Sequence, residues 1–402
     1  MNKRSGSPRI LYISEVAPNQ SSFGGAMRSV NVLRALQQMG TVEVVVLNGE
    51  IENHNGTPQR DTEFTVAKTF DVVEQSTSGL IDQIKWTLDP RTSFPNGCAV
   101  SQDATDYVLR RLPEFDLIWF FKLRSPDMFP NASWPRSVVD VDDLPSLYEG
   151  AAMRAGGTPG ERLKALRRRF SWRRRERLMG SRFTVLSVCS EEDKNYLESI
   201  GVSVPVHILP NGFDKPKVEP IRSPVTPPRI GFIGLFDYFP NRDAMEWFTS
   251  KCWTQIKRDV PDARLRLIGQ GSEEFSRKLG PDVDGLGWLA EPSEEITTWS
   301  VMAVPIRVGA GTRVKIAFGF SQKCPIVSTS FGAWGYGAVD GDEMYLADSP
   351  EQFSAACVKL IRQPEMAKQM AERAWQKFLN NWTWDSIRPA VLAAAEDCLR
   401  RA

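Results

Sequence analysis

The feature that most constrains the fold is the alternation of short apolar, β-rich runs with helical patterns along almost the whole chain. Five such runs precede residue 190: Arg9–Ser14, Val42–Asn48, Asp116–Phe121, Ser137–Asp143 and Phe183–Cys189. Between the first two runs, apolar residues recur every three or four positions from Ala26 to Met39, which is typical of an amphipathic helix. Repeated strand–helix–strand units predict a parallel sheet with helices on both faces.

The alternation breaks between Asn211 and Pro228, where prolines are too dense for a helix or a central strand. It restarts with a predicted strand at Arg229–Gly234, a helix around Ala244–Arg258 and a further strand at Arg264–Gly269. A chain of 402 residues is also too long for one ordinary core. The sequence therefore predicts an α/β protein with two doubly wound, Rossmann-like domains that face a cleft. We place the domains at residues 1–215 and 216–380, followed by a helix at 381–402 that returns to the first domain.

Composition narrows the class of protein. The apolar fraction of 42%, the charged fraction of 25% and the net charge of +1 are those of a globular protein with no general attraction to nucleic acid or to anionic membranes. The chain has two histidines and no closely paired cysteines, which argues against a histidine-based metal site. It shows neither a signal-peptide core nor an apolar run long enough to cross a bilayer, so we expect a cytoplasmic protein.

A glycine loop between a predicted strand and a predicted helix is the strongest candidate site. Val301–Arg307 is the strand, Val308–Thr312 contains two glycines, and Arg313 and Lys315 stand at the start of the helix. Backbone N–H groups, the helix dipole and two cations would converge there on one anion. The spacing fits neither a Walker loop nor a dinucleotide fingerprint. The pattern predicts a phosphate or diphosphate site, although cations on a first helical turn can also simply face solvent.

A second glycine pair, Gly24 and Gly25, stands just ahead of the first helix. Ligands of doubly wound sheets collect at the carboxyl ends of the strands, where such loops lie. We therefore expect both glycine loops to face the same cleft.

Six blocks of sequence, taken in order, resemble the GT-B glycosyltransferases and specifically glycosyltransferase family 4, which belongs to group 1. The blocks are Phe23–Gly40, Val185–Leu197, Val206–Asp214, Arg229–Phe248, Pro261–Gly271 and Pro305–Gly335. Each block is weakly informative by itself, but their order and spacing together are specific.

The resemblance implies a retaining glycosyltransferase that moves a sugar from a nucleotide-diphosphate sugar to a glycan, a lipid-linked acceptor or a small molecule. Arg313 and Lys315 match the basic positions of the family and are assigned to the donor phosphates as catalytic cations, because charge develops on the diphosphate as the anomeric bond breaks. The donor-binding positions are Gly24, Gly25, Gly234, Arg307, Gly311, Thr312, Phe318 and Trp334. No cofactor and no metal are expected, since protein cations replace the metal in this fold.

Two aromatic residues stand where the resemblance leads us to expect glutamates. Phe318 replaces the carboxylate that holds the ribose hydroxyls, and Trp334 lies in the following glycine loop. Both rings would stack on the nucleoside, or else donor binding is degraded. The second case defines the alternative function, a catalytically inactive GT-B protein that acts as a binding or scaffolding partner.

Charged residues after two strands of the first domain have two interpretations each. Lys122 and Arg124 would contact the acceptor or the phosphates, or they form a solvated strand end. Asp140 and Asp142 lie on one face and favour acceptor contact or capping of the next helix over metal binding.

The segment Arg162–Arg177 is the densest run of charge, with nine cations interleaved with Leu163, Leu166, Phe170 and Trp172. This pattern suits an anionic membrane surface, which would make the protein peripheral on the inner face of the membrane. An ordinary exposed helix explains it equally well. Nucleic acid is disfavoured, because the net charge is near zero and no recognition module is present.

Overall fold

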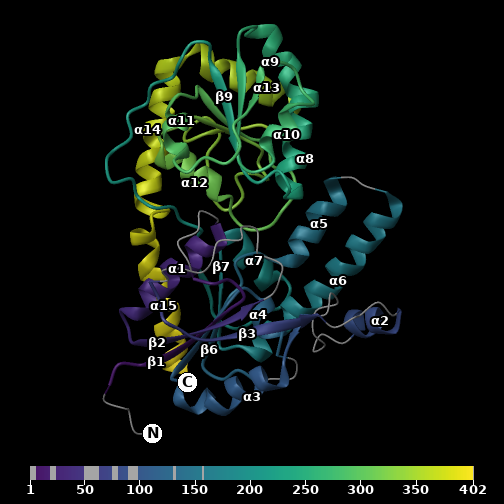
Figure 1. Ribbon diagram of the computed structural model, residues 1–402, viewed down its shortest axis with the longest axis vertical. Helices are drawn as coiled ribbons and strands as arrows, with labels where there is room; N and C mark the ends of the chain where they lie inside the picture. Colours follow the sequence, from purple (N-terminus) through teal and green to yellow (C-terminus); the bar gives the residue numbers. More distant parts are fainter. Residues whose placement is uncertain are drawn as a thin grey trace. The chain divides into compact units, whose positions relative to one another are not determined.

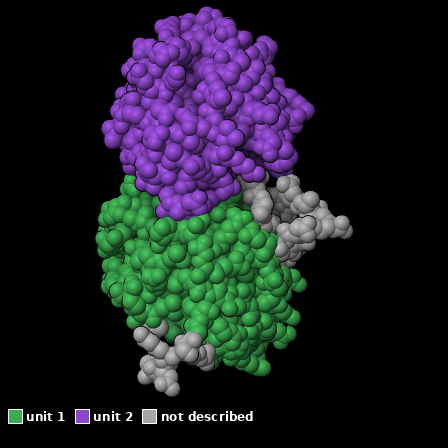
Figure 2. Space-filling view, turned by 90° about the vertical axis from the view of Figure 1, so that its left-hand side faces the viewer, with its two compact units in different colours: residues 1–210, 387–402 green, residues 211–386 purple. Residues whose placement is uncertain are grey.

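The chain folds into two compact units, which Figure 2 colours separately. In the computed structural model, unit 1 comprises residues 1–210 and 387–402, and unit 2 comprises residues 211–386. The structure describes residues 6–18, 24–48, 63–74, 80–88, 98–129, 133–155 and 158–401. The chain passes between the units after residues 210 and 386, whereas the sequence placed these boundaries after residues 215 and 380.

Unit 1 is built on one sheet, which within the described residues has eight strands in the order β4-β3-β2-β1-β5-β6-β7-β8. Neighbouring strands are parallel except β3 and β4, which run antiparallel at the edge. The strands are β1 (Arg9–Ser14), β2 (Thr41–Asn48), β3 (Val66–Glu74), β4 (Cys98–Val100), β5 (Leu117–Phe121), β6 (Ser137–Asp140), β7 (Val185–Val188) and β8 (Val206–Ile208).

The helices of unit 1 surround this sheet (Figure 1). They are α1 (Gly24–Gln37), α2 (Leu80–Leu88), α3 (Gln102–Arg111), α4 (Arg124–Asp127), α5 (Pro145–Ala155), α6 (Pro159–Arg182) and α7 (Glu191–Ser199). The final helix α15 (Trp384–Arg401) belongs to this unit from Ile387 onward. A contact of 3.2 Å between His207 Nε2 and Asp397 Oδ2 joins α15 to β8.

Unit 2 has a sheet of six parallel strands in the order β11-β10-β9-β12-β13-β14. The strands are β9 (Arg229–Ile233), β10 (Arg264–Ile268), β11 (Val283–Gly285), β12 (Val301–Val304), β13 (Ile326–Ser328) and β14 (Tyr345–Leu346). The helices are α8 (Phe239–Trp247), α9 (Trp253–Asp259), α10 (Ser272–Ser276), α11 (Pro292–Thr297), α12 (Val314–Ser321), α13 (Pro350–Arg362) and α14 (Pro364–Asn381).

The predicted fold class, α/β with two doubly wound domains, is confirmed by these two sheets. Every residue of β5 (Leu117–Phe121) is buried, as a strand covered by helices on both faces requires. The cleft expected between the two domains stays a prediction.

Two helix predictions need correction. Helix α1 begins at Gly24, so Gly24 and Gly25 occupy its first turn instead of a loop ahead of it. Glycine is costly mainly in helix interiors, and a first turn accommodates the pair. The helix predicted around 244–258 is interrupted by a π-helical turn at Phe248–Cys252, where the Thr249 hydroxyl donates a hydrogen bond to the Met245 carbonyl oxygen.

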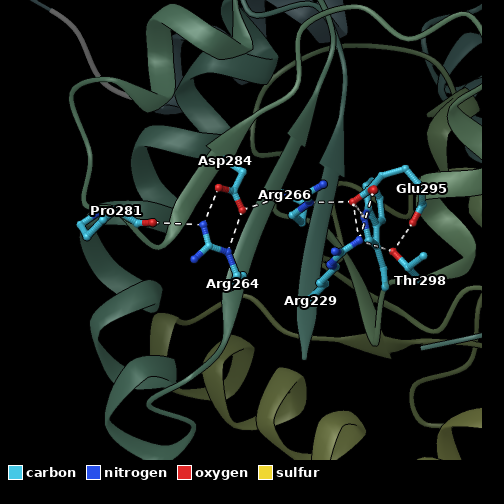
Figure 3. Close-up of polar contacts among 8 residues, drawn as sticks. Arg229, Arg264, Arg266, Pro281, Asp284, Glu295 and Thr298 are labelled. Carbon is cyan, nitrogen blue, oxygen red and sulfur yellow. Dashed lines mark hydrogen bonds and ion pairs between the residues drawn. The ribbon is translucent and has the colours of Figure 1, made fainter. Parts of the chain in front are cut away.

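One face of β9 and β10 carries an ion-pair network in place of the apolar packing expected for buried strands (Figure 3). Arg264 Nε donates to Asp284 Oδ2 at 2.9 Å, and Arg266 Nε donates to Glu295 Oε1 of α11 at 2.7 Å. Arg229 lies 3.3 Å from the same carboxylate. Burial alone would raise the pKa of Glu295, but its hydrogen bonds and the nearby guanidinium groups lower it overall. The network therefore holds α11 against the sheet through charges.

None of the helices in the described part of the chain is long and apolar enough to cross a bilayer.

Candidate functional site

The glycine loop predicted as a phosphate site lies between β12 and α12, at the carboxyl edge of the unit 2 sheet. Gly309 and Gly311 adopt left-handed backbone conformations, with φ of 138° and 66°. A Cβ atom at Gly309 would also lie 2.9 Å from Nη2 of Arg313. Both glycines are therefore required by the shape of this loop.

The Arg313 side chain folds back over the loop that precedes it. Its Nη1 donates to the carbonyl oxygens of Ala310 and Gly311, the second at 2.8 Å. The guanidinium carbon lies 5.3 Å from the centre of the Phe331 ring. These contacts brace the glycine loop and keep a positive charge beside it.

The Lys315 side chain connects the first turn of α12 to the first turn of α8 and to β9. Its Nζ donates to Asn241 Oδ1 at 2.7 Å and lies 3.9 Å from the centre of the Phe232 ring. A Cβ atom at Gly234 would be only 3.0 Å from this ammonium group, so glycine leaves the space that the lysine occupies. The structure thus brings together Gly234 and Lys315, which were predicted separately.

Lys315 is a cation with an unusual environment. Burial lowers the pKa of its ammonium group well below the ordinary value, and the charge of Arg313 lowers it further. Among the described residues, no carboxylate forms an ion pair with it, and its hydrogen-bond acceptor is the neutral Asn241 side chain. A desolvated cation of this kind gains from an anion supplied by a ligand.

Thr312 adds a hydroxyl group at the end of the glycine loop, directly before the N-cap residue of α12. The residue is buried, and its Oγ1 has no hydrogen-bond partner within the described structure. A buried polar atom left unsatisfied is costly, so a site for an acceptor such as a phosphate oxygen is the natural explanation.

Tyr336 fixes the first turn of α12 from the loop after β13. Its buried hydroxyl accepts a hydrogen bond from the Ala317 N–H at 3.2 Å and donates to the Arg313 carbonyl oxygen at 2.8 Å. The first N–H groups of a helix have no intrahelical acceptor and carry the positive end of the dipole. Lys315, Thr312 and this helix terminus therefore form one positively polarised site.

Arg307 lies in contact with α8. Its Nη2 donates to Asp243 Oδ1 at 2.7 Å, and its guanidinium carbon lies 5.6 Å from the centre of the Trp247 ring. The predicted donor contact of Arg307 would have to compete with this ion pair.

Phe318 lies in the core of unit 2. It is only 6% exposed, and its ring stacks on Phe213 with 4.5 Å between centroids and 26° between planes. Phe213 in turn donates its N–H to the Trp382 carbonyl oxygen at 2.9 Å. One face of Phe318 is thus occupied by the chain that enters unit 2, while Trp334 remains partly exposed in the loop after β13.

The candidate residues of unit 1 lie at the carboxyl ends of β5 and β6. Lys122 and Asp142 both adopt left-handed backbone conformations, with φ of 64° and 60°. Such strain in residues other than glycine is concentrated at functional sites. Arg124 Nε lies 3.7 Å from Glu15 Oε2, and Asp142 Oδ1 accepts a hydrogen bond from Cys189 Sγ at 3.3 Å.

Asp140 does not cap the next helix, so that interpretation is wrong for this residue. It is fully buried and accepts two hydrogen bonds from Arg28, at 2.6 and 2.9 Å, because the guanidinium inside the core requires a carboxylate. In the first turn of α5, the Ser146 N–H instead donates a hydrogen bond to Oε1 of Glu176 at 2.9 Å. Neither Arg28 nor Glu176 carries a local sequence signal for these roles, because their partners lie far along the chain.

Asn241 belongs to the unit 2 site, although the sequence does not predict a role for it. Its Nδ2 donates to the Leu235 carbonyl oxygen at 2.9 Å while its Oδ1 holds Lys315. The one feature of the sequence that points to Asn241 is its position near the start of α8, the helix that follows β9.

Across the residues whose placement is described, no group of three or more His, Cys, Asp or Glu side chains is arranged to hold a metal ion. The expectation that the chemistry needs no metal and no cofactor stays a prediction.

Comparison with known proteins bears directly on this site. Residues 227–363 match the family model described as Glycosyl transferases group 1, and this segment contains the glycine loop and α12. The solved structure of sucrose-phosphate synthase from Thermosynechococcus elongatus is similar over 95% of this chain and 96% of its own, with 12% identity and a TM-score of 0.67. The predicted resemblance to group 1 glycosyltransferases of the GT-B fold is confirmed. Assignment to family 4 in particular stays a prediction.

Two further proteins are similar to this chain. HepE from Anabaena, solved in complex with UDP and glucose, is 13% identical, with a TM-score of 0.62 over 96% of this chain and 98% of its own. At such identity the likeness concerns the fold alone. An uncharacterized 44.6 kDa protein in the cps region of Klebsiella pneumoniae is 22% identical over 198 residues, which are 46% of this chain and 49% of that protein. The match thus spans about half the length of this relative.

Proposed function

We propose that the chain is a retaining glycosyltransferase that moves a sugar from a nucleotide-diphosphate sugar to a glycan, a lipid-linked acceptor or a small molecule. The observation that carries the proposal is Lys315, a desolvated cation at a glycine loop and helix N-terminus with no carboxylate partner among the described residues. A diphosphate supplies the missing negative charge. The match of residues 227–363 to a glycosyltransferase family model supports the same conclusion.

In the proposed reaction, the bond between the anomeric carbon and the diphosphate oxygen breaks while the acceptor oxygen bonds to the same face of that carbon. The departing phosphate takes the proton of the acceptor hydroxyl, so no separate enzymic base is required. Negative charge accumulates on the diphosphate in the transition state. Lys315, Arg313, the Thr312 hydroxyl and the first turn of α12 would stabilise this charge because they are already in position.

The donor is proposed to carry UDP or a related nucleoside diphosphate. HepE, which shares the fold, was solved with UDP and glucose, which supports this class of donor. Gly24 and Gly25 would approach the diphosphate from unit 1, with Gly234 and Gly311 on the side of unit 2. Lys122, Arg124 and Asp142 would contact the acceptor from unit 1.

Release of free nucleoside diphosphate from the matching nucleotide sugar tests the proposal. The double variant Arg313→Ala/Lys315→Ala should lower kcat by about 1,000-fold or more, since removal of one preorganised donor typically costs about 100- to 1,000-fold. The matched control is Arg277→Ala/Lys278→Ala, which removes two exposed cations elsewhere in unit 2. Turnover that survives in a folded Arg313/Lys315 variant refutes the assignment.

A second function is favoured by Phe318. This residue stands where the family resemblance places a ribose-binding carboxylate, and its ring packs into the core of unit 2. A protein that has lost donor binding would act as a scaffold or binding partner. Calorimetry with UDP-, GDP- and dTDP-linked sugars separates the two functions, because the scaffold predicts no binding to any donor even at about millimolar concentration.

A further inference from the structure

Helix α6 (Pro159–Arg182) is attached to unit 1 by one face. That face buries Trp172, Glu176 and Met179 among the neighbouring elements. A capping box formed by Thr158 and Glu161 fixes its first turn. The opposite face of the helix is therefore presented in a defined orientation.

The outer face of α6 carries a row of exposed apolar side chains. Leu163, Leu166 and Phe170 follow one another at spacings of three and four residues, so they lie on one side of the helix. Their exposed fractions are between 49% and 68%. Single exposed apolar residues are ordinary on a protein surface, but a continuous row points to an interaction.

Helix α2 (Leu80–Leu88) presents a second row with the same spacing. Ile81, Ile84 and Leu88 are exposed to between 48% and 69%. The two helices are in contact, and Figure 1 draws them on the same side of unit 1. We name the two rows, with the exposed cations of α6, the α2–α6 surface.

Cations continue the row along α6. Arg173 and Arg177 follow Phe170 at spacings of three and seven residues, and Arg174 lies next to them, all three exposed. Arg162 and Lys164 are exposed at the other end of the row. Within the described part of α6 the one exposed acid is Glu161, which is engaged in the capping box.

An anionic bilayer would bind both the apolar rows and the cations of the α2–α6 surface. Apolar side chains on a helix that lies in the membrane plane enter the boundary between head groups and acyl chains, and arginines bind the phosphates above it. An arginine side chain can also bury its aliphatic stem while its guanidinium group stays at the level of the phosphates. Apolar and basic residues can therefore lie on the same side of the helix. Nucleic acid would neutralise the arginines but would leave two rows of leucine, isoleucine and phenylalanine in water.

We infer that the α2–α6 surface docks on a lipid bilayer that contains anionic phospholipid. The six apolar residues enter the interface, and Arg173, Arg174 and Arg177 contact the lipid phosphates. This inference concerns binding and is independent of the proposed transferase activity, so each can fail without the other.

Flotation of the full-length protein with vesicles tests the inference. Vesicles of phosphatidylcholine mixed with phosphatidylglycerol should carry the protein to the top of the gradient, whereas vesicles of phosphatidylcholine alone should leave it at the bottom. Raising the ionic strength from about 0.05 M to about 0.5 M should release it, because the Debye length falls severalfold.

Two variants separate the apolar and the basic contributions. Leu163→Gln/Leu166→Gln/Phe170→Gln should lower the partition coefficient about tenfold, because the apolar area no longer leaves water. Arg173→Gln/Arg174→Gln/Arg177→Gln should lower it by at least about tenfold, since each cation near an anionic surface is worth about fivefold. All six positions are exposed, and unchanged thermal unfolding will show that the fold is retained.

Matched controls lie in unit 2. Val218→Gln/Ile221→Gln removes two exposed apolar side chains, and Arg258→Gln/Arg277→Gln/Lys278→Gln removes three exposed cations. Both controls should float like the unmodified protein. Equal recovery with the two vesicle types, or unchanged flotation of both α6 variants, overturns the inference. Retention of the protein by single-stranded RNA without any flotation overturns it too and assigns the surface to nucleic acid.

Discussion

The stability of unit 1 should depend on pH through Glu176, the buried carboxyl group on the inner face of α6. Burial raises its pKa from 4.5 to about 7, although hydrogen bonds from Ser146 and Tyr196 partly oppose the shift. At a pH between these two values, Glu176 carries a proton in the folded state that it has already lost in the unfolded state. Stability from this group is complete below the unfolded pKa and falls as pH rises toward 7, with a total of about 3 kcal/mol for a shift of this size.

The variant Glu176→Gln removes this titration and keeps a side chain of similar shape. Urea denaturation should give a stability difference, variant minus unmodified protein, that grows from under about 1 kcal/mol near pH 5 to about 3 kcal/mol near pH 8. Glu161→Gln, on the first turn of the same helix, is a control of opposite sign, because the backbone hydrogen bond at Thr158 lowers the pKa of Glu161. A difference for Glu176→Gln that does not change with pH would refute the reasoning.

Three further predictions follow from individual contacts. Asp140→Ala leaves the Arg28 guanidinium buried without its carboxylate and should cost about 3–5 kcal/mol of unfolding free energy in urea denaturation. Gly231→Ala places a Cβ about 2.0 Å from the Trp299 ring and should lower stability by about 1–3 kcal/mol, whereas Gly160→Ala, with nothing within 4 Å, should not destabilise the protein. Thr312→Val should leave thermal unfolding unchanged or raise its midpoint while weakening nucleoside diphosphate binding about tenfold in calorimetry, because a charge-assisted hydrogen bond is lost.

The sequence predicts the two sheets well because buried parallel strands consist of continuous runs of apolar residues. β5 (Leu117–Phe121) is such a run, and all its residues are buried. The glycine loop before α12 is predictable for a similar reason, since left-handed backbone at Gly309 and Gly311 restricts the residue type. Local conformation and local pattern are sufficient in both cases.

The contacts that complete the site could not be predicted in this way. Lys315 and Asn241 are 74 positions apart, and only the register of β9 with β12 brings them together. The pairing of Arg28 with Asp140, 112 positions apart, likewise depends on tertiary structure. The family resemblance predicts Phe318 as a stacking platform for the nucleoside, but its stacking on Phe213 depends on where the chain enters unit 2.

The most direct test of the central claim is calorimetric titration of the protein with UDP and GDP, in buffers of different ionisation enthalpy and at several pH values. Because burial lowers the pKa of Lys315 in the free protein, a bound diphosphate should raise it again, and binding should take up protons. Affinity should be constant below the pKa of free Lys315 and fall as pH rises through it. Lys315→Met should abolish the proton uptake and weaken binding, while Lys278→Met, at an exposed lysine, should change neither. Tight binding by Lys315→Met with the same proton uptake would contradict the account.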